Sequence, residues 1–321
     1  MKKFLTLLVA LHLAFAATWA NAQAFPSKTV RIIVPFPPGG TTDILARELA
    51  NLLRIRWNVP VVVDNRGGAS GTIGSTEVAR ATPDGYTLLL TATHHVINPS
   101  IRKSLPYDTQ RDFTSLALVG TVANVLVVNR DFPARNVADL IRIAKDKPGS
   151  IGFASTGIGG ANHLAGELFK VMAGVDMTHI AYKGAAPAMT DLQGGHVSVM
   201  FDGLPGVLQA IESGRLRALG VTTLKRLPEM PNVPTIDESG VKNFEVLSWF
   251  GLYGPANLPA DVTARISNDV LAVMRSPELK ERFAKVGTEP GLLGQREFTT
   301  FVGSEITKWM RVVEEAKIPK E

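Results

Sequence analysis

One stretch, residues 29–43, constrains the fold more than any other because it joins an extended segment to a helix through a tight turn. Its β-branched run predicts a buried strand, and residues 35–40 form a turn rich in proline and glycine. Thr41, Thr42 and Asp43 follow and offer side-chain oxygens that suit the start of a helix. The stretch therefore predicts a strand, a loop and a helix in direct succession.

The glycines of this turn indicate an anion-binding loop. Gly39 and Gly40 let the backbone approach a bound group closely, and the first amides of a helix attract negative charge. A second glycine-rich turn, residues 66–71, follows the next predicted strand, residues 61–65. Because ligands bind at the carboxyl ends of parallel strands, both loops are expected to face one crevice. A plain βα turn remains the commoner use of one Gly-Gly pair.

The second half of the chain repeats this alternation, which predicts an α/β fold of two doubly wound domains joined by two crossing strands. Extended runs at 116–120 and 125–129 suggest the first crossing, and residues 244–253 suggest the return. Helices at 259–274, 277–285 and 295–316 lack strands of their own and should pack on the first domain. The predicted units are a signal peptide (1–22), domain 1 (23–123 and 254–321) and domain 2 (124–253).

Residues 1–22 resemble a cleavable signal peptide and predict a periplasmic protein. Lys2 and Lys3 precede an apolar run, residues 4–17, that is too short to cross a bilayer, and Ala20 and Ala22 supply the small residues of a cleavage site. The chain contains no cysteine, so its stability must come from the core rather than from disulfides.

The charge balance argues against a nucleic-acid partner. The chain has 34 basic and 29 acidic residues, and loss of Lys2 and Lys3 would reduce the net charge from +5 to +3. These charges are scattered, and the chain has no tract rich in lysine and arginine. A weak preference for small anions is all that this balance supports.

Several catalytic interpretations fit poorly. No glycine loop carries a nucleotide-binding spacing, and the pair His94 and His95 lacks a third ligand at metal spacing. A secreted esterase would need Ser70 with one of these histidines, yet the turn around Ser70 lacks the closing glycine of a nucleophile elbow. We therefore expect no catalytic residue, no metal and no cofactor, and binding is favoured over chemistry.

Several motifs together resemble the Bug/TctC receptors, the extracytoplasmic solute-binding proteins of tripartite tricarboxylate transport. They are VPFPPGGTTD at 34–43, VDNRGGASG at 63–71, PDGYT at 83–87, HVINP at 95–99 and HLAGE at 163–167. The resemblance implies a type II periplasmic binding fold that closes on its ligand like a Venus flytrap. It also implies that loops 38–42 and 68–71 hold a carboxylate through backbone amides and water.

The resemblance and the strand ends together define sixteen candidate ligand-binding residues. They are Phe36, Pro38, Gly39, Gly40, Thr41, Thr42, Gly68, Ala69, Ser70, Gly71, Thr93, His94, Thr156, Gly157, Tyr182 and Asp202. His94 stands where the family pattern has a small hydroxyl residue, and Gly160 stands where serine is commoner. The class of carboxylate stays open between dicarboxylates, tricarboxylates, amino acids and aromatic acids.

The expected partners are a small carboxylate and the membrane permease subunits of a tripartite transporter, and the expected state is a monomer. A different class of function stays open, in which the closed protein signals through a membrane sensor. A secreted esterase is the most distant alternative.

Overall fold

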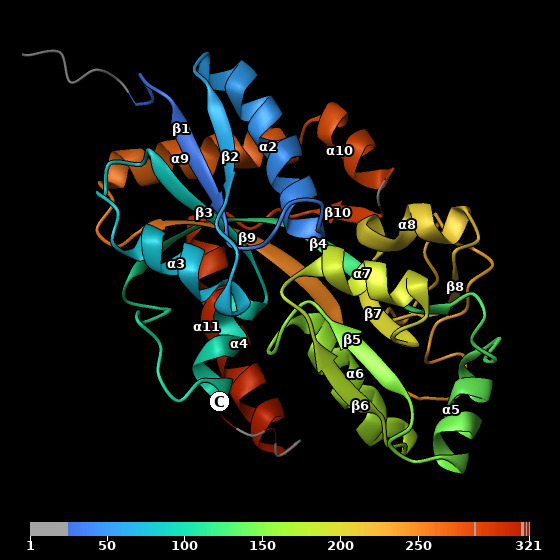
Figure 1. The fold of residues 1–321 in the computed structure, drawn as a ribbon. Coiled ribbons are helices and arrows are strands. Elements are labelled where there is room, and N and C mark those ends of the chain that lie inside the picture. The colour runs from blue at the N-terminus through green and yellow to red at the C-terminus, as the bar shows by residue number, and fades with distance from the viewer. Residues whose placement is uncertain (1–24, 286, 316–317, 319, 321) are drawn as a thin grey trace, which may run out of the picture.

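The computed structural model describes residues 25–315, 318 and 320, with the exception of residue 286. The predicted signal peptide, residues 1–22, lies outside the described residues. Within the described part of the chain, the helices are too short or too polar to span a bilayer. The fold is mixed α/β, and its strands form one curled sheet with two lobes (Figure 1).

The first lobe is built on a parallel three-stranded unit with β1 in its centre. Antiparallel β9 follows β3, and β4 follows β9. The strands are β1 (Val30–Val34), β2 (Val61–Asn65), β3 (Thr87–Ala92), β4 (Phe113–Asn129) and β9 (Leu247–Pro255). The helices after β1, β2 and β3 are α2 (Thr41–Trp57), α3 (Thr72–Ala79) and α4 (His94–Ile101), with a short 3₁₀ turn, η1 (Ala69–Gly71), before α3.

The second lobe repeats this strand order. Its parallel unit has β5 in the centre, and antiparallel β4 lies between β7 and β8. The strands are β5 (Gly152–Ser155), β6 (Thr178–Ala181), β7 (Val199–Gly203) and β8 (Leu216–Val221). The helices are α5 (Val137–Asp146), α6 (Ala161–Ala173), α7 (Ala185–Gly194) and α8 (Leu204–Glu212).

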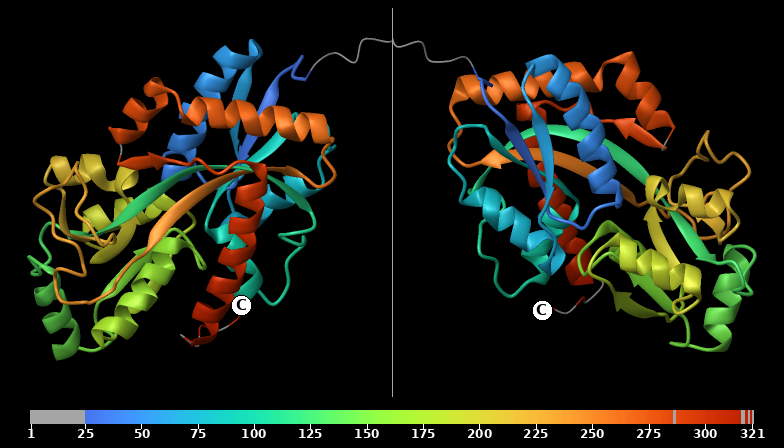
Figure 2. Two further views of the ribbon diagram at one scale, coloured as in Figure 1. Left: turned by 180° about the vertical axis from the view of Figure 1, so that it is seen from behind. Right: turned by 45° about the horizontal axis from the view of Figure 1, so that its top comes forward.

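Strand β4 joins the two lobes as one continuous element. Ala123 pairs with Leu247 of β9, whereas Asn124 pairs with Gly203 of β7, so the strand changes partners between these two residues. Strand β9 runs beside β4 along the first lobe (Figure 2). The predicted crossing from one lobe to the other is therefore an unbroken strand.

The C-terminal helices pack on the first lobe, as the sequence predicted. They are α9 (Ala260–Met274), α10 (Pro277–Ala284) and α11 (Gln295–Glu315). Helix α9 contacts α2 and β4, and α11 contacts α4 and β4. Residue 316, the predicted end of the last helix, lies outside the described residues. The short strand β10 (Thr288–Pro290), which pairs with β4, was not predicted.

Two local predictions were wrong, and one helix was not predicted. The N-cap of α2 is Gly40, and Thr41 to Asp43 already belong to the helix, so their side chains do not cap it. Helix α4, which contains His94, His95 and Pro99, was not predicted. The helical spacing at 162–173 predicts that Met172 faces inward, but Met172 is 38% exposed and does not face the core of its lobe. The predicted Asn136 cap of α5 is correct, since its side-chain oxygen accepts from Asp139 N at 2.8 Å.

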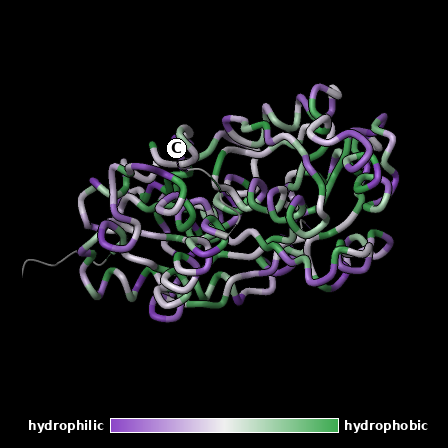
Figure 3. Tube along the Cα trace, turned by 90° about the horizontal axis from the view of Figure 1, so that it is seen from below, coloured by the Kyte–Doolittle hydropathy of each residue, from purple (hydrophilic) through white to green (hydrophobic). Residues whose placement is uncertain are grey.

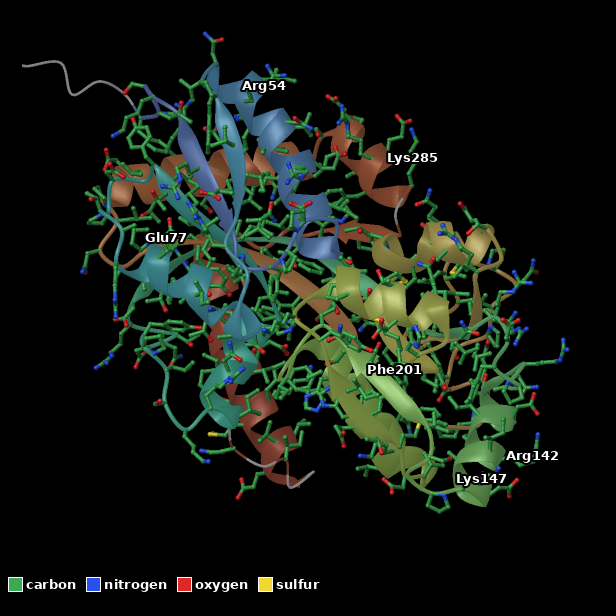
Figure 4. The ribbon with its side chains drawn as sticks, viewed as in Figure 1. Arg54, Glu77, Arg142, Lys147, Phe201 and Lys285 are labelled. Carbon is green, nitrogen blue, oxygen red and sulfur yellow. The ribbon has the colours of Figure 1, made fainter. Side chains whose placement is uncertain are left out.

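The apolar side chains gather on both faces of each sheet. In the second lobe Phe153, Phe169 and Phe201 are fully buried, and Figure 4 shows Phe201 inside this lobe and Arg142 at its outer end. Hydrophilic segments follow the outer turns of the trace (Figure 3). Each lobe therefore has its own hydrophobic core. A ligand-binding site can lie between the two lobes.

Candidate functional site

A cavity lies between the lobes, at the carboxyl ends of the parallel strands of each lobe. The volume open to the centres of water molecules is about 60 Å³. One water needs roughly 10–15 Å³ on this measure, so the cavity has room for a small ligand. Its walls come from both lobes, and the lining residues are Phe36, Pro37, Gly40, Thr41, Thr42, Ala92, Thr93, His94, Thr156, Ala161, Asn162, Gly184, Ala185, Asp202, Gly203, Ser248 and Phe250.

The cavity brings together half of the candidate residues. Those that line it are Phe36, Gly40, Thr41, Thr42, Thr93, His94, Thr156 and Asp202. The other candidates do not line it: Pro38, Gly39, Gly68, Ala69, Ser70, Gly71, Gly157 and Tyr182. Pro38 and Gly39 are exposed at the outer side of their loop.

Sequence reasoning missed nine lining residues. Gly184, Ala185 and Gly203 begin helices directly after strands, which is a signal that the sequence contains. Ser248 and Phe250 alternate along the return strand β9, and no local pattern marks them. The remaining missed residues are Pro37, Ala92, Ala161 and Asn162.

Four helix starts converge on the cavity, and each has a glycine as its N-cap. The N-caps of α2, α6, α7 and α8 are Gly40, Gly160, Gly184 and Gly203, and none has a side-chain capping bond. The first amides of a helix have no partner within the helix, so they donate hydrogen bonds to a side-chain oxygen, to water or to a ligand. With their aligned dipoles, these amides make the cavity favourable for an anion.

One wall carries two buried oxygens without partners. Thr41 Oγ1 and Asp202 Oδ2 have no hydrogen-bond partner among the described residues. A Cβ added at Gly206 would lie 2.9 Å from Asp202 Oδ2 and 3.7 Å from Thr41 Oγ1, so both oxygens lie beside this glycine. Burial raises the pKa of Asp202 to about 7, and the amide of Gly203 opposes this rise. Asp202 is therefore a group that changes charge near neutral pH.

His94 forms another wall of the cavity. Its ring is 5% exposed and packs at 4.9 Å from the ring centroid of Phe36. Neither ring nitrogen has a hydrogen-bond partner among the described residues. Burial, helped by the charge of Arg102, lowers the pKa of His94 to about 4, so the ring is neutral at pH 7.

The second glycine loop has another role in the structure. Ala69 and Ser70 have φ values of 47° and 51°, and Asn98 Nδ2 donates to the carbonyl oxygen of Ser70 at 3.2 Å. A Cβ at Gly157 would lie 3.0 Å from Ser70 Oγ, so Ser70 faces the second lobe. The ring nitrogens of His95, like those of His94, have no hydrogen-bond partner among the described residues. Ser70 therefore has no hydrogen-bonded histidine base in this part of the structure.

Tyr182 and two other histidines lie outside the cavity lining. The hydroxyl of Tyr182 donates to Asp191 Oδ2 at 2.8 Å, and burial together with this carboxylate raises the pKa of Tyr182 to about 12. The rings of His163 and His179 stack at 3.9 Å, and His179 Nε2 lies 2.6 Å from Ser155 Oγ. His163 Nδ1 accepts from Gly159 N at 3.2 Å. Both histidines thus have polar partners.

Two lobes with the same strand order and a cavity between them define a periplasmic-binding-protein fold. Residues 45–318 match the family model described as the tripartite tricarboxylate transporter family receptor. The chain belongs to this family, known as the Bug/TctC receptors, and has the fold of its periplasmic solute-binding proteins.

Named relatives and solved structures agree with this family. BugT of Bordetella pertussis is 36% identical over 92% of this chain and 91% of its own. The structure of the periplasmic binding protein BugD is 37% identical, with a TM-score of 0.88, and covers 92% of this chain and 100% of that one. An R. palustris protein solved with adipate is 35% identical, with a TM-score of 0.90 and the same coverage.

Proposed function

We propose that this protein is a periplasmic receptor that captures a small organic carboxylate in the cavity between its lobes. In this proposal it delivers the ligand to the membrane components of a tripartite tricarboxylate-type transporter and catalyses no reaction. The observation that carries the proposal is the convergence of four uncapped helix starts, those of α2, α6, α7 and α8, on one buried cavity.

Helix amides can hold a carboxylate without any cationic side chain, and no lysine or arginine lines this cavity among the described residues. Two relatives support the ligand class. One is the R. palustris protein solved with adipate. The other is MatC from Rhodopseudomonas palustris with bound malate, which is 28% identical over 90% of this chain and all of its own, with a TM-score of 0.82.

The proposal assigns the eight candidate residues that line the cavity to the ligand, and it retains a periplasmic location and a monomeric state. The proposed domains remain 23–123 with 254–321, and 124–253. The change of partners on β4 between Ala123 and Asn124 supports the first of these boundaries. Closure of the two domains would bury the ligand.

A thermal-shift screen of the mature chain against mono-, di- and tricarboxylates, amino acids and aromatic acids tests the proposal. A ligand that binds only the folded state stabilises it by about 2.7 kcal/mol at a hundred times its Kd. We expect one class of acid to raise the midpoint. If no acid raises the midpoint of folded, ligand-free protein, the carboxylate assignment is wrong.

A further inference from the structure

We propose that His94 and Gly160 form a contacting pair at one wall of the cavity and that this pair limits the length of the ligand. His94 occupies the space that the missing side chain of Gly160 leaves, so the cavity ends at the imidazole ring. This inference rests on the proposed function, because it names what selects among carboxylates at the same site.

The two residues meet from different lobes. His94 begins α4 after β3, and Gly160 is the N-cap of α6 after β5. A Cβ added at Gly160 would overlap His94 Nε2 and lie 2.5 Å from both His94 Cε1 and Asn162 Oδ1. Real Cβ atoms essentially never come within 3.0 Å of such neighbours. A histidine at 94 and any side chain at 160 therefore exclude each other in this arrangement of the lobes.

The same glycine loop receives a second side chain from α4. A Cβ at Gly159 would overlap Ile101 Cδ1 and lie 3.3 Å from its Cγ1. The loop is held in place because Gly159 N donates to His163 Nδ1 at 3.2 Å. Helix α4 thus packs against Gly159 and Gly160 of the second lobe, which have no side chains. His94 is the α4 residue that contacts this pair of glycines and also lines the cavity.

The imidazole ring has little freedom to leave this position. It is 5% exposed, and the ring of Phe36 packs against it at 4.9 Å. A smaller side chain at 94 would extend the cavity toward Gly160 and Asn162. The longer cavity would accept a longer ligand. One methylene in a matched pocket changes affinity by roughly 10–200-fold.

Calorimetric titration with straight-chain dicarboxylates from malonate to pimelate tests this inference. We expect His94→Ala to move the preferred chain length upward, so that the ratio of adipate to succinate affinity rises by about tenfold or more. Gly160→Ala should weaken all these acids by about tenfold or more, because its Cβ meets His94 when the lobes close. The double variant removes the clash with His94 but keeps the close approach to Asn162 Oδ1, so we expect it to recover part of the binding and to prefer the longer acids.

A matched control is available elsewhere in the second lobe. Gly194 also lies beside a histidine, His196, but that ring is exposed and can move away from a Cβ, which would meet it at 3.1 Å. His196→Ala and Gly194→Ala should leave the affinity profile unchanged. Thermal unfolding of each variant without ligand checks that it is folded.

Two results would overturn the inference while the proposed function stands. One is a His94→Ala variant that binds as tightly as wild type and has an unchanged ratio of adipate to succinate affinity. The other is a Gly160→Ala variant that binds all these acids like wild type. If neither these dicarboxylates nor the acids of the wider screen bind any variant, the proposed function fails and the inference fails with it.

Discussion

The two glycine loops of the first lobe look alike in sequence but differ in what they contact. The loop before α2 places Gly40, Thr41 and Thr42 on the cavity, whereas none of residues 68–71 lines it. The second loop instead presents Ser70 to Gly157 of the other lobe and is tied to α4 by Asn98. Glycine content therefore predicts a tight turn after a strand, but not whether the turn holds a ligand or a neighbouring lobe.

The largest expected effect lies in the first loop. Gly40 has φ −84°, which any residue adopts, and a Cβ there would lie 3.4 Å from Ala185 Cβ. Gly40→Leu should keep the fold but fill the space between α2 and α7, and we expect it to weaken carboxylate binding by about 100-fold or more. Gly40→Ala, which makes only an ordinary contact, is the control for calorimetry. Unchanged affinity in Gly40→Leu would remove this loop from the site.

The next effect concerns Asp202, which lies beside Thr41 of the first loop. Its pKa of about 7 means that the carboxyl gains negative charge between pH 6 and 8 and then repels an anionic ligand. We expect succinate affinity to fall by about tenfold over this range, which is about 1.4 kcal/mol. Asp202→Asn should remove that part of the pH dependence, and the exposed Asp131→Asn should not.

Protein stability gives a second readout for Asp202. Its folded pKa is raised above the usual value of 3.8, so the protonated form favours folding. The stabilisation is complete below pH 3.8 and is lost as the pH rises through about 7. The difference in unfolding free energy between Asp202→Asn and wild type should therefore grow from pH 5 to pH 8. A constant difference would contradict the assignment.

A smaller effect on binding is expected in the second loop. Gly71 has φ +87°, and a Cβ there would lie 3.3 Å from Phe36 Cζ. Gly71→Ala should lower the unfolding free energy by about 1–2 kcal/mol, because its backbone conformation is unfavourable for alanine. Affinity measured by calorimetry should change by less than about threefold. A loss as large as that of Gly40→Leu would make the two loops equivalent.

The smallest effect is expected at Ser70. Its φ of 51° lies in the left-handed region, which glycine adopts at lower cost. Ser70→Gly should raise the unfolding free energy by about 0.5 kcal/mol in chemical denaturation and leave affinity unchanged. Reaction of wild-type Ser70 with a phosphonate probe would instead revive the esterase alternative.

Much of the fold could be predicted because its signals are local. The apolar strands, the glycine turns and the helix spacing fixed the α/β alternation, and Asn136 marked the start of α5. Helix α4 was missed because Pro99 and two adjacent histidines look unfavourable in a helix, yet burial among other elements stabilises it. Strand β10 has only three residues and ends in Pro290, so its pairing with β4 is decided by tertiary structure.

The site was harder to predict because its walls come from segments far apart in sequence. Gly40 and Ala185 lie close together, although 145 positions separate their numbers, and Phe250 reaches the cavity from the return strand. Ser70 and Gly157 were predicted to bind the ligand, but in the structure they lie beside each other and neither lines the cavity. Which glycine loops face the ligand depends on how the lobes meet, and no local pattern encodes that.

An amide NMR titration of ¹⁵N-labelled protein with the best acid from the screen shows which of the two glycine loops holds the ligand. We expect the resonances of Thr41, Thr42 and Asp43 to shift most and to saturate with the ligand's Kd, because these amides begin α2 at the cavity. The amides of Ala69 and Ser70 should shift far less. Large saturating shifts at Ala69 and Ser70, with none at Thr41 and Thr42, would place the ligand at the second loop instead of the first.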